Sequence, residues 1–313
     1  MTHHTIRDTV IDIKDKLAAL DTHALADMVL KTYPPKLKEL RKEFFARYEN
    51  TADEYGFDLN AVRFWEPLCR FFFEDYFQVK VLGLENIPAE GGAILIGNHS
   101  GVLPVDAFML FESIYHNHPS PRRIRFLAHE WFNQTPSLKG FVCGLGGVPA
   151  RFSVAMKLLK TEELVFFYPE GLRGVSKPFS KRYQTMEFNS GFVKAALLTG
   201  KPIIPIATVG LDEIYPLLGT IPFVAKLWGT PFYPVTYTFP WLPFPSSCIP
   251  LPIKTLIKIG KPVYLSYPPE AALDRGLRKR LAHEFQNLTQ RELDFLLSKR
   301  KSPFADWDLE ALR

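Results

Sequence analysis

The sequence is poor in cysteine and has no long apolar run. Its cysteines form no Cys-x-x-Cys pair and no metal-ligand spacing, so we expect reduced thiols in a cytosolic setting. The first residues include no apolar core of a signal peptide, which gives secretion no support. No run of about 18 uninterrupted apolar residues occurs, so a spanning helix is not expected and any membrane contact should be peripheral. The cysteines are Cys69, Cys143 and Cys248.

Several signatures of other enzymes are also missing. His129-Glu130 lacks a second histidine four residues further on, so the zinc-protease motif is absent. No Gly-x-Ser-x-Gly elbow occurs, which argues against a serine hydrolase of the common α/β type. The glycines at 144, 146 and 147 do not complete a dinucleotide-binding fingerprint. We therefore expect neither a metal nor a bound cofactor.

Positively charged side chains only slightly outnumber negatively charged ones. The sequence has 38 Lys and Arg against 33 Asp and Glu, a formal net charge of +5. This balance is too mild and too dispersed to predict nucleic-acid binding. It does suit anionic lipid headgroups or anionic substrates.

From residue 79 onward, short apolar runs alternate with helical patterns. This alternation predicts an α/β fold with a mainly parallel sheet covered by helices on both faces. Ligands in such sheets bind beyond the carboxyl ends of the strands, so the residues after each strand matter most. The predicted strands are 93–97, 124–128, 164–168, 202–209 and 255–259. The predicted helices are 106–114, 136–143, 152–160, 187–199 and 277–297.

The first 78 residues are predicted to be a mostly helical N-terminal segment. Over 36–48, apolar side chains recur at helical spacing. Over 62–77, aromatic residues are interleaved with charged ones. We expect this segment either to pack on the following domain, residues 79–313, or to lie on a membrane surface as an amphipathic helix.

An unusual insertion is predicted over residues 221–253. Lys226 is its only charged side chain between 221 and 252, whereas aromatic residues and prolines are frequent. Proline interrupts helices and strand interiors, so we expect an irregular apolar loop. Such a loop either folds onto the core, lines the path of an apolar ligand, or dips into a bilayer interface, where Trp and Tyr are favoured.

A histidine and an aspartate directly follow the predicted strand 93–97. Residues 97–106 read Gly-Asn-His-Ser-Gly-Val-Leu-Pro-Val-Asp. An imidazole takes a proton from an alcohol near neutral pH, and a carboxylate on its other nitrogen would fix the tautomer. His99 and Asp106 are therefore candidates for a general base and its partner. Taken alone, a histidine and an aspartate in one loop are more often structural.

Three further stretches make the pattern specific. They read Gly-Leu-Gly-Gly-Val-Pro-Ala-Arg at 144–151, Phe-Tyr-Pro-Glu-Gly-Leu-Arg-Gly at 167–174 and Lys-Pro-Ile-Ile-Pro-Ile-Ala at 201–207. With the His99 stretch, and in this order, they resemble the four motifs of the glycerol-phosphate and lysophosphatidic acid acyltransferase superfamily. The resemblance covers residues 79–265. Its most specific part is Tyr-Pro-Glu-Gly-x-Arg, where the family has Phe-Pro-Glu-Gly-x-Arg.

The resemblance implies a role for each matching residue. His99 would activate the acceptor hydroxyl, with Asp106 as its orienting partner. Arg151 would hold an acceptor phosphate, which a guanidinium grips through two parallel hydrogen bonds. The acceptor site would be shaped by Glu170, Gly171 and Arg173.

One departure from the family lies in the first motif. The family usually has four residues between the histidine and the aspartate, whereas this chain has six. The stretch is similar to a sub-branch that reads Asn-His-Ser-Gly-x-x-Pro-x-Asp. In the family this loop borders the substrate. The longer spacing therefore leaves the identity of the acceptor lipid undetermined.

The resemblance implies an O-acyltransferase that acts at the cytoplasmic side of a membrane. It would move a fatty acyl group from acyl-coenzyme A or acyl carrier protein to a glycerolipid hydroxyl. The first candidate acceptor is a lysophospholipid such as lysophosphatidic acid, and the alternative is mono- or diacylglycerol. Rivals of another class are a non-catalytic lipid-binding protein and a thioesterase.

Two polar clusters are predicted to face solvent. Residues 116–118, His-Asn-His, precede a proline and are interpreted as a solvated loop. Lys177, Lys181 and Arg182 follow the third motif and are interpreted as a solvated face, with contacts to the phosphates of coenzyme A as the alternative.

Overall fold

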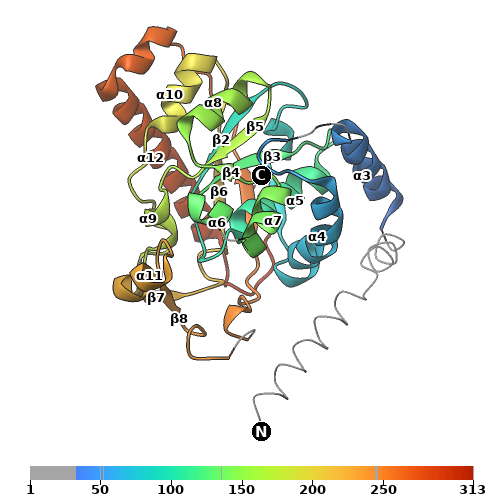
Figure 1. The fold of residues 1–313 in the computed structure, drawn as a ribbon, viewed down its shortest axis with the longest axis vertical. Coiled ribbons are helices and arrows are strands. Elements are labelled where there is room, and N and C mark those ends of the chain that lie inside the picture. Colours follow the sequence, from blue (N-terminus) through green and yellow to red (C-terminus); the bar gives the residue numbers. More distant parts are fainter. Residues whose placement is uncertain (1–32, 50, 52, 135, 244–245, 313) are drawn as a thin grey trace.

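A seven-stranded sheet organises the protein. The computed structural model describes residues 33–49, 51, 53–134, 136–243 and 246–312. The strand order is β1-β9-β6-β2-β5-β3-β4, and every neighbouring pair is parallel except β6 with β9. The predicted α/β class is therefore confirmed (Figure 1). The strands are β1 Lys80–Leu82, β2 Ala93–Gly97, β3 Ile124–Ala128, β4 Val148–Pro149, β5 Leu164–Phe167, β6 Ile203–Val209 and β9 Leu256–Ile259.

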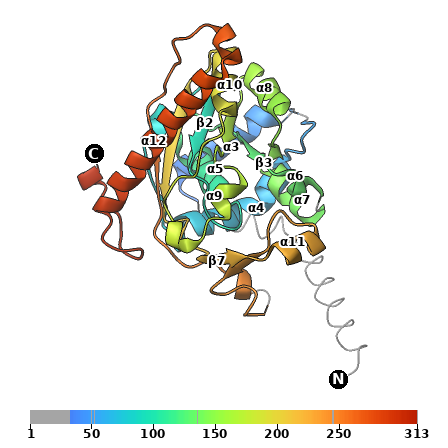
Figure 2. The same cartoon turned by 90° about the vertical axis from the view of Figure 1, so that its left-hand side faces the viewer.

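Helices cover both faces of the sheet, and this is why the central strands are apolar throughout. Alternate side chains of β2 point to opposite faces: Ile94 and Ile96 pack with one set of helices, and Leu95 packs with the other. The first set is α8 Phe152–Lys160, α10 Gly191–Thr199 and α12 Arg275–Lys299, the last crossing the face shown in Figure 2. The second set is α3 Pro35–Tyr48, α4 Leu59–Phe71, α5 Val105–Asn117 and α7 Pro136–Gly144.

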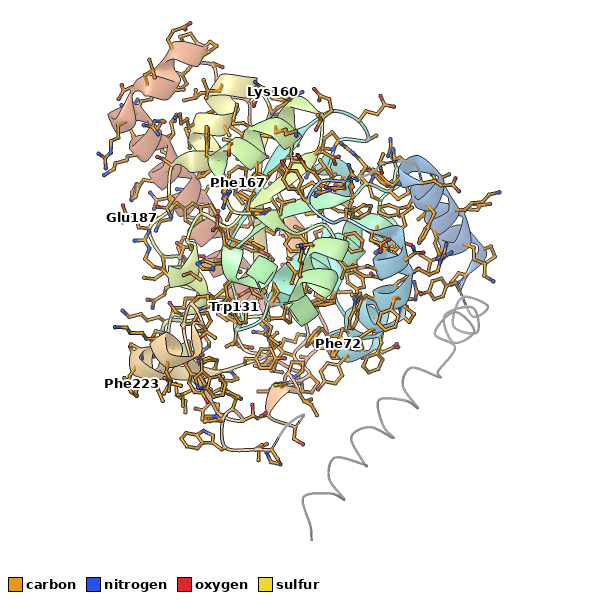
Figure 3. All side chains as sticks on the ribbon, in the orientation of Figure 1. Phe72, Trp131, Lys160, Phe167, Glu187 and Phe223 are labelled. Atoms are coloured by element: carbon orange, nitrogen blue, oxygen red, sulfur yellow. The ribbon has the colours of Figure 1, made fainter. Side chains whose placement is uncertain are left out.

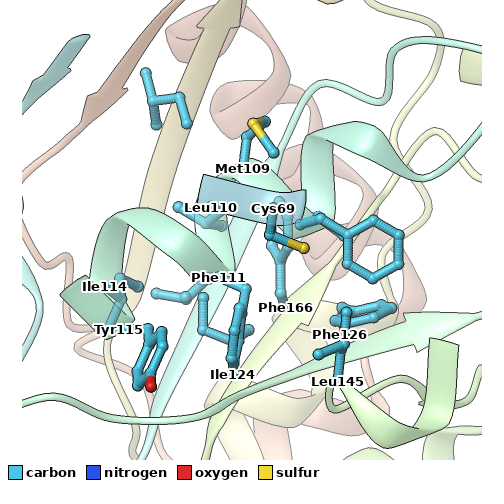
Figure 4. Packing of buried hydrophobic residues seen from close by; sticks show 14 of the residues in the cluster. Cys69, Met109, Leu110, Phe111, Ile114, Tyr115, Ile124, Phe126, Leu145 and Phe166 are labelled. Carbon is cyan, nitrogen blue, oxygen red and sulfur yellow. The ribbon is translucent and has the colours of Figure 1, made fainter. Parts of the chain in front are cut away.

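Helix α5 is the centre of the second layer. Figure 4 shows Phe111 and Tyr115 of α5 among the buried apolar side chains near β3. Phe44 of α3 packs on Tyr115, with 4.5 Å between ring centroids. Burying a large apolar side chain of this kind contributes about 1.5–3 kcal/mol. The described helices of the N-terminal segment thus share the core of the sheet, whereas residues 1–32 of that predicted segment lie outside the described residues, and the boundary at 78/79 stays a prediction.

The prediction that residues 116–118 form a solvated loop is wrong. His116 is buried inside α5. Its Nε2 lies 3.1 Å from Glu66 Oε1, and its Nδ1 bonds Glu112. Burial opposes the charge of His116, but the carboxylates of Glu112 and Glu66 raise its pKa to about 9. Arg41 of α3 donates to Glu66, so an ionic cluster joins α3, α4 and α5.

Helix α10 begins at Gly191, four residues later than the predicted start at 187. The amides that would open the longer helix are bonded elsewhere. The N–H of Phe188 donates to Gln286 Oε1, and that of Asn189 donates to Pro169 O. Gly200, in the left-handed conformation with φ of 66°, ends the helix as predicted.

The insertion is partly regular, so the prediction of a wholly irregular loop is wrong. Strands β7 Leu217–Thr220 and β8 Pro234–Thr236 form an antiparallel hairpin. Between them lies helix α11, Pro222–Trp228. Its proline occupies the first turn, where no intrahelical N–H is needed, and Gly229 ends the helix with φ of 64°. Two shorter helices near the sheet are α6 Glu130–Gln134 and α9 Leu172–Val175.

Candidate active site

The sheet register brings two motif loops to the same edge. Strands β2 and β5 are parallel neighbours, and Ile96 pairs with Phe167. His99 and Glu170 each follow three residues beyond that pair, so both leave the carboxyl edge of the sheet together. The His99 N–H donates to Glu170 Oε1 over 2.9 Å. This edge is where ligands bind in sheets of this type.

Asp106 returns to His99 despite the six-residue separation. The Nδ1 of His99 lies 2.8 Å from Asp106 Oδ2. The carboxylate also accepts from the N–H groups of Ser100 and Ala107, at 3.1 and 2.9 Å. Gly101 allows the loop to close because its φ is 81°, a conformation that side chains disfavour. A carboxylate at Nδ1 favours the tautomer in which Nε2 is free to accept a proton.

The imidazole of His99 is held flat against Tyr168. The two rings are stacked, with 3.7 Å between centroids and 17° between planes. The side chain is 17% exposed, and Nε2 has no hydrogen-bond partner among the described residues. Burial and the adjacent Asp106 raise the pKa of Tyr168 well above its usual value, so the phenol stays neutral.

His99 lines an apolar cavity of about 400 Å³. One wall comes from the loop after β2 and the ends of β3, the other from the insertion. Apolar cavities with few polar groups are typical sites for small hydrophobic ligands, and an acyl chain is such a ligand. The insertion contributes Trp228, Thr230, Pro231, Phe232, Tyr233, Pro234, Thr236, Phe239, Ser247 and Cys248. The opposite wall includes Leu103, Phe126, Ala128, Trp131, Phe132 and Val142.

Glu170 and Gly171 support the main chain around His99. Glu170 is buried, and its second oxygen accepts from the Met186 N–H over 2.8 Å. Burial raises the pKa of Glu170. Gly171 has φ of 59° and ψ of −147°, and its N–H donates to Tyr168 O over 3.0 Å. These two residues shape the turn after β5 and do not line the cavity.

The structure does not bring Arg151 and Arg173 into the cavity. The Arg151 side chain is 63% exposed and pairs with Glu130, 2.5 Å from Nε to Oε1. Arg173 is also exposed, and its Nη2 donates to Glu187 O over 2.8 Å. The structure therefore brings together four of the predicted site residues, His99, Asp106, Glu170 and Gly171. The other two, Arg151 and Arg173, lie at the surface.

Sequence reasoning missed two residues that position the site. Asn98 is buried and bonds both main-chain groups of Thr208 in β6, at 3.0 and 2.9 Å. It thereby fixes the start of the His99 loop. Tyr168 provides the ring under His99. A polar residue at the end of an apolar strand and an aromatic residue before Pro-Glu-Gly were the available signals.

Two kinds of feature are absent from the described part of the chain. No group of three or more His, Cys, Asp or Glu side chains is arranged to hold a metal ion. Within the same residues, no helix is long and apolar enough to span a membrane.

Comparison with known proteins extends these observations. The Acyltransferase family model matches residues 78–209, a range that contains all four motifs. Uncharacterized protein ML2427 of Mycobacterium leprae is 39% identical over 81% of this chain and 70% of its own. The chloroplastic 1-acyl-sn-glycerol-3-phosphate acyltransferase LPAT1 of Arabidopsis thaliana is 26% identical over 45% of this chain and 38% of its own.

A crystal structure is also similar in part. It is the 1-acyl-sn-glycerophosphate acyltransferase PlsC of Thermotoga maritima, with a TM-score of 0.48 and 17% identity, over 90% of this chain and 98% of that chain. The motifs, their positions after β2 and β5, and the family match agree with one another. The chain belongs to the glycerolipid acyltransferase superfamily and is an O-acyltransferase.

Proposed function

We propose that this enzyme transfers a fatty acyl group from acyl-coenzyme A or acyl carrier protein to a glycerolipid hydroxyl, with His99 as the general base. The observation that supports this most is the His99–Asp106 pair at the wall of an apolar cavity. The acceptor oxygen attacks the thioester carbonyl as its proton passes to His99 Nε2. The carbon–sulfur bond then breaks, and the thiolate takes the proton from the imidazolium.

Asp106 supports this step by stabilising the imidazolium that forms. No covalent enzyme intermediate is needed, because the acceptor attacks the thioester directly. Proton transfer to a positioned base is worth about 10²- to 10⁴-fold in rate. The thiolate is a weak base, so its departure needs little help from an acid.

The first candidate acceptor is a lysophospholipid such as lysophosphatidic acid. Arg151 occupies the position in the second motif that would bind the phosphate. In the structure Arg151 pairs with Glu130. Glu130 is next in the sequence to His129, which lines the cavity, so the ion pair lies near the cavity. An exposed ion pair contributes little to stability, so an acceptor phosphate could replace Glu130 without a large penalty.

A neutral acceptor such as mono- or diacylglycerol is the second candidate. Among the described residues that line the cavity, none is lysine or arginine. A buried phosphate requires a cation or several donors. The apolar lining therefore favours an acceptor that presents only hydroxyls and acyl chains.

We further propose that the insertion docks the enzyme on the cytoplasmic surface of a membrane. The exposed face of α11 presents Phe223, which is 76% exposed, together with Leu227 and Trp228. Phe223 and Phe72, near the end of α4, lie toward the same end of the molecule (Figure 3). Exposed aromatic residues such as Phe223 and Trp228 favour the bilayer interface, and the cavity borders this insertion, so a lipid acceptor has a short path to His99. Flotation with vesicles should recover wild-type protein and lose Phe223→Ser/Trp228→Ser; equal recovery of both would contradict the proposal.

Release of thiol from palmitoyl-coenzyme A tests the reaction and the acceptor together. The acceptors are lysophosphatidic acid, lysophosphatidylcholine, monoacylglycerol and diacylglycerol, supplied in vesicles. Release that needs one acceptor and yields its acylated product supports the proposal. Release of free fatty acid without any acceptor would instead identify a thioesterase. The absence of release with both coenzyme A and carrier-protein donors would favour a lipid-binding protein.

A further inference from the structure

Three buried ionisable side chains lie behind the His99 loop. Lys177 Nζ is 3.3 Å from Asp212 Oδ2 and 3.9 Å from Glu170 Oε2. All three side chains are buried, so the prediction that Lys177 faces solvent is wrong. Among the described residues, no other cation forms an ion pair with either carboxylate. A buried charge is destabilising unless it is paired, so one ammonium compensates two carboxylates from different loops.

Glu170 connects this cluster to the catalytic loop. One of its oxygens accepts from the His99 N–H and the other from the Met186 N–H. An ionised carboxylate offers only acceptors, whereas a protonated carboxyl turns one oxygen into a donor. A neutral carboxyl would therefore accept these two N–H groups less well, and the observed contacts favour Glu170 in its ionised form.

The surroundings of Glu170 act on its ionisation in both directions. Burial raises the pKa of Glu170. The ammonium of Lys177 and the N–H groups of Met186 and His99 lower it, and the charge of Asp212 raises it again. Lys177 is thus the one charged group of the cluster that favours the carboxylate.

We propose that Lys177 is a positioning residue for acyl transfer: its ammonium keeps Glu170 as the carboxylate that fixes the main chain at His99. Helix α9, which precedes Lys177, also packs against the His99 loop. A Cβ added at Gly174 in α9 would lie 2.8 Å from the Cβ of His99, so α9 already packs against the catalytic loop. The consequence for catalysis rests on the proposed function, whereas the ionisation of Glu170 does not.

The His99 amide provides a test that does not depend on activity. The chain has eight histidines, so ¹⁵N-histidine labelling gives a simple NMR spectrum, in which His99→Gln identifies the His99 signal. The amide shift should follow the ionisation of Glu170. In Lys177→Met its midpoint should move to higher pH by about one to three units, because an opposite charge at this range is lost. In Asp212→Asn it should move to lower pH, because a like charge is lost.

The matched control is Lys160→Met, which removes an exposed lysine at the end of α8 and should leave the midpoint unchanged. Lys177→Arg should keep the wild-type midpoint. An unmoved midpoint in Lys177→Met would overturn the proposal. If Lys177→Met fails to fold, Lys177→Gln, which keeps a polar side chain without the charge, replaces it and should show the same shift to higher pH.

Catalysis is then measured on the same variants. Because protonation of the general base His99 also lowers kcat at acid pH, the readout is the ratio of kcat for Lys177→Met to kcat for Lys177→Arg. This ratio should fall as the pH drops through the NMR midpoint of Lys177→Met, with an unchanged KM for the thioester. A ratio that stays constant through that midpoint would reject the positioning role. If the wild-type protein releases no thiol with any acceptor, the proposed function fails, while the NMR titration still decides the role of Lys177 in holding Glu170.

Discussion

The ring of His99 lies face to face with the ring of Tyr168, 3.7 Å apart between centroids. Asp106 holds the same imidazole at Nδ1. A hydrogen bond alone would let the ring turn about the Nδ1–Oδ2 direction, whereas the stack fixes its plane. The two contacts together determine where Nε2 points in the cavity.

Loss of this stack should slow the chemical step. Tyr168→Ala should lower kcat about tenfold to a hundredfold, because misplacing a catalytic group by about 1 Å has effects of this size. Tyr168→Phe, which keeps the ring, is the control and should retain most of the activity. Steady-state kinetics with a saturating acceptor measure both variants. Equal activity of Tyr168→Ala and Tyr168→Phe would show that the stack is not needed.

A single methyl group at Gly174 should displace the catalytic loop. The added Cβ would meet His99 Cβ at 2.8 Å and Glu170 Cβ at 3.0 Å. We expect Gly174→Ala to lose at least about tenfold in kcat. Gly191→Ala is the matched control, since nothing lies within 4 Å of a Cβ built there. Wild-type kcat in Gly174→Ala would contradict the close packing of α9 on His99.

Charge reversal at Arg151 should separate the two candidate acceptors. If Arg151 holds a phosphate, Arg151→Glu should lower kcat/KM for lysophosphatidic acid by about tenfold to a hundredfold, the worth of a hydrogen bond to a charged group. Activity on diacylglycerol should not change. Lys160→Glu, which reverses an exposed charge elsewhere, controls for a general effect. A lysophosphatidic acid activity that survives Arg151→Glu would remove Arg151 from the acceptor site.

The ionic cluster at His116 should make stability depend on pH. The folded pKa of about 9 exceeds the ordinary value near 6.5. The contribution is therefore complete below about pH 6.5 and is lost as the pH rises through about 9. A shift of this size corresponds to on the order of 3 kcal/mol. Urea unfolding should show a larger difference between wild type and His116→Gln at pH 6.5 than at pH 9.5, and equal differences would contradict the assignment.

Much of the fold could be predicted because its signals are local. The run Ala93–Gly97 is apolar on both faces, which marks a central parallel strand, and Gly200 marks the end of α10. Once the strands are parallel neighbours, the residues that follow them meet at one edge. The proximity of His99 and Glu170 follows from that geometry.

The remaining features depend on partners far away in the sequence. From the sequence His116 is interpreted as part of a solvated loop, but Glu66, 50 residues earlier, bonds it inside the core. In the sequence Lys177 resembles a surface lysine. In the fold, the turn that follows β6 places Asp212 beside it. Helix α11 could not be predicted from the number of prolines, because its own proline lies in the first turn, where a helix tolerates it. No periodicity encodes these pairings.

The role of His99 as general base is the central claim, and acceptor-dependent thiol release by His99→Ala tests it most directly. The acyl-thioester donor is held at saturation, and wild type and variant are compared with the same acceptor. We predict that kcat falls by about 10²- to 10⁴-fold, while the folded state and the KM for the donor are retained. Turnover by His99→Ala near the wild-type value would contradict the mechanism.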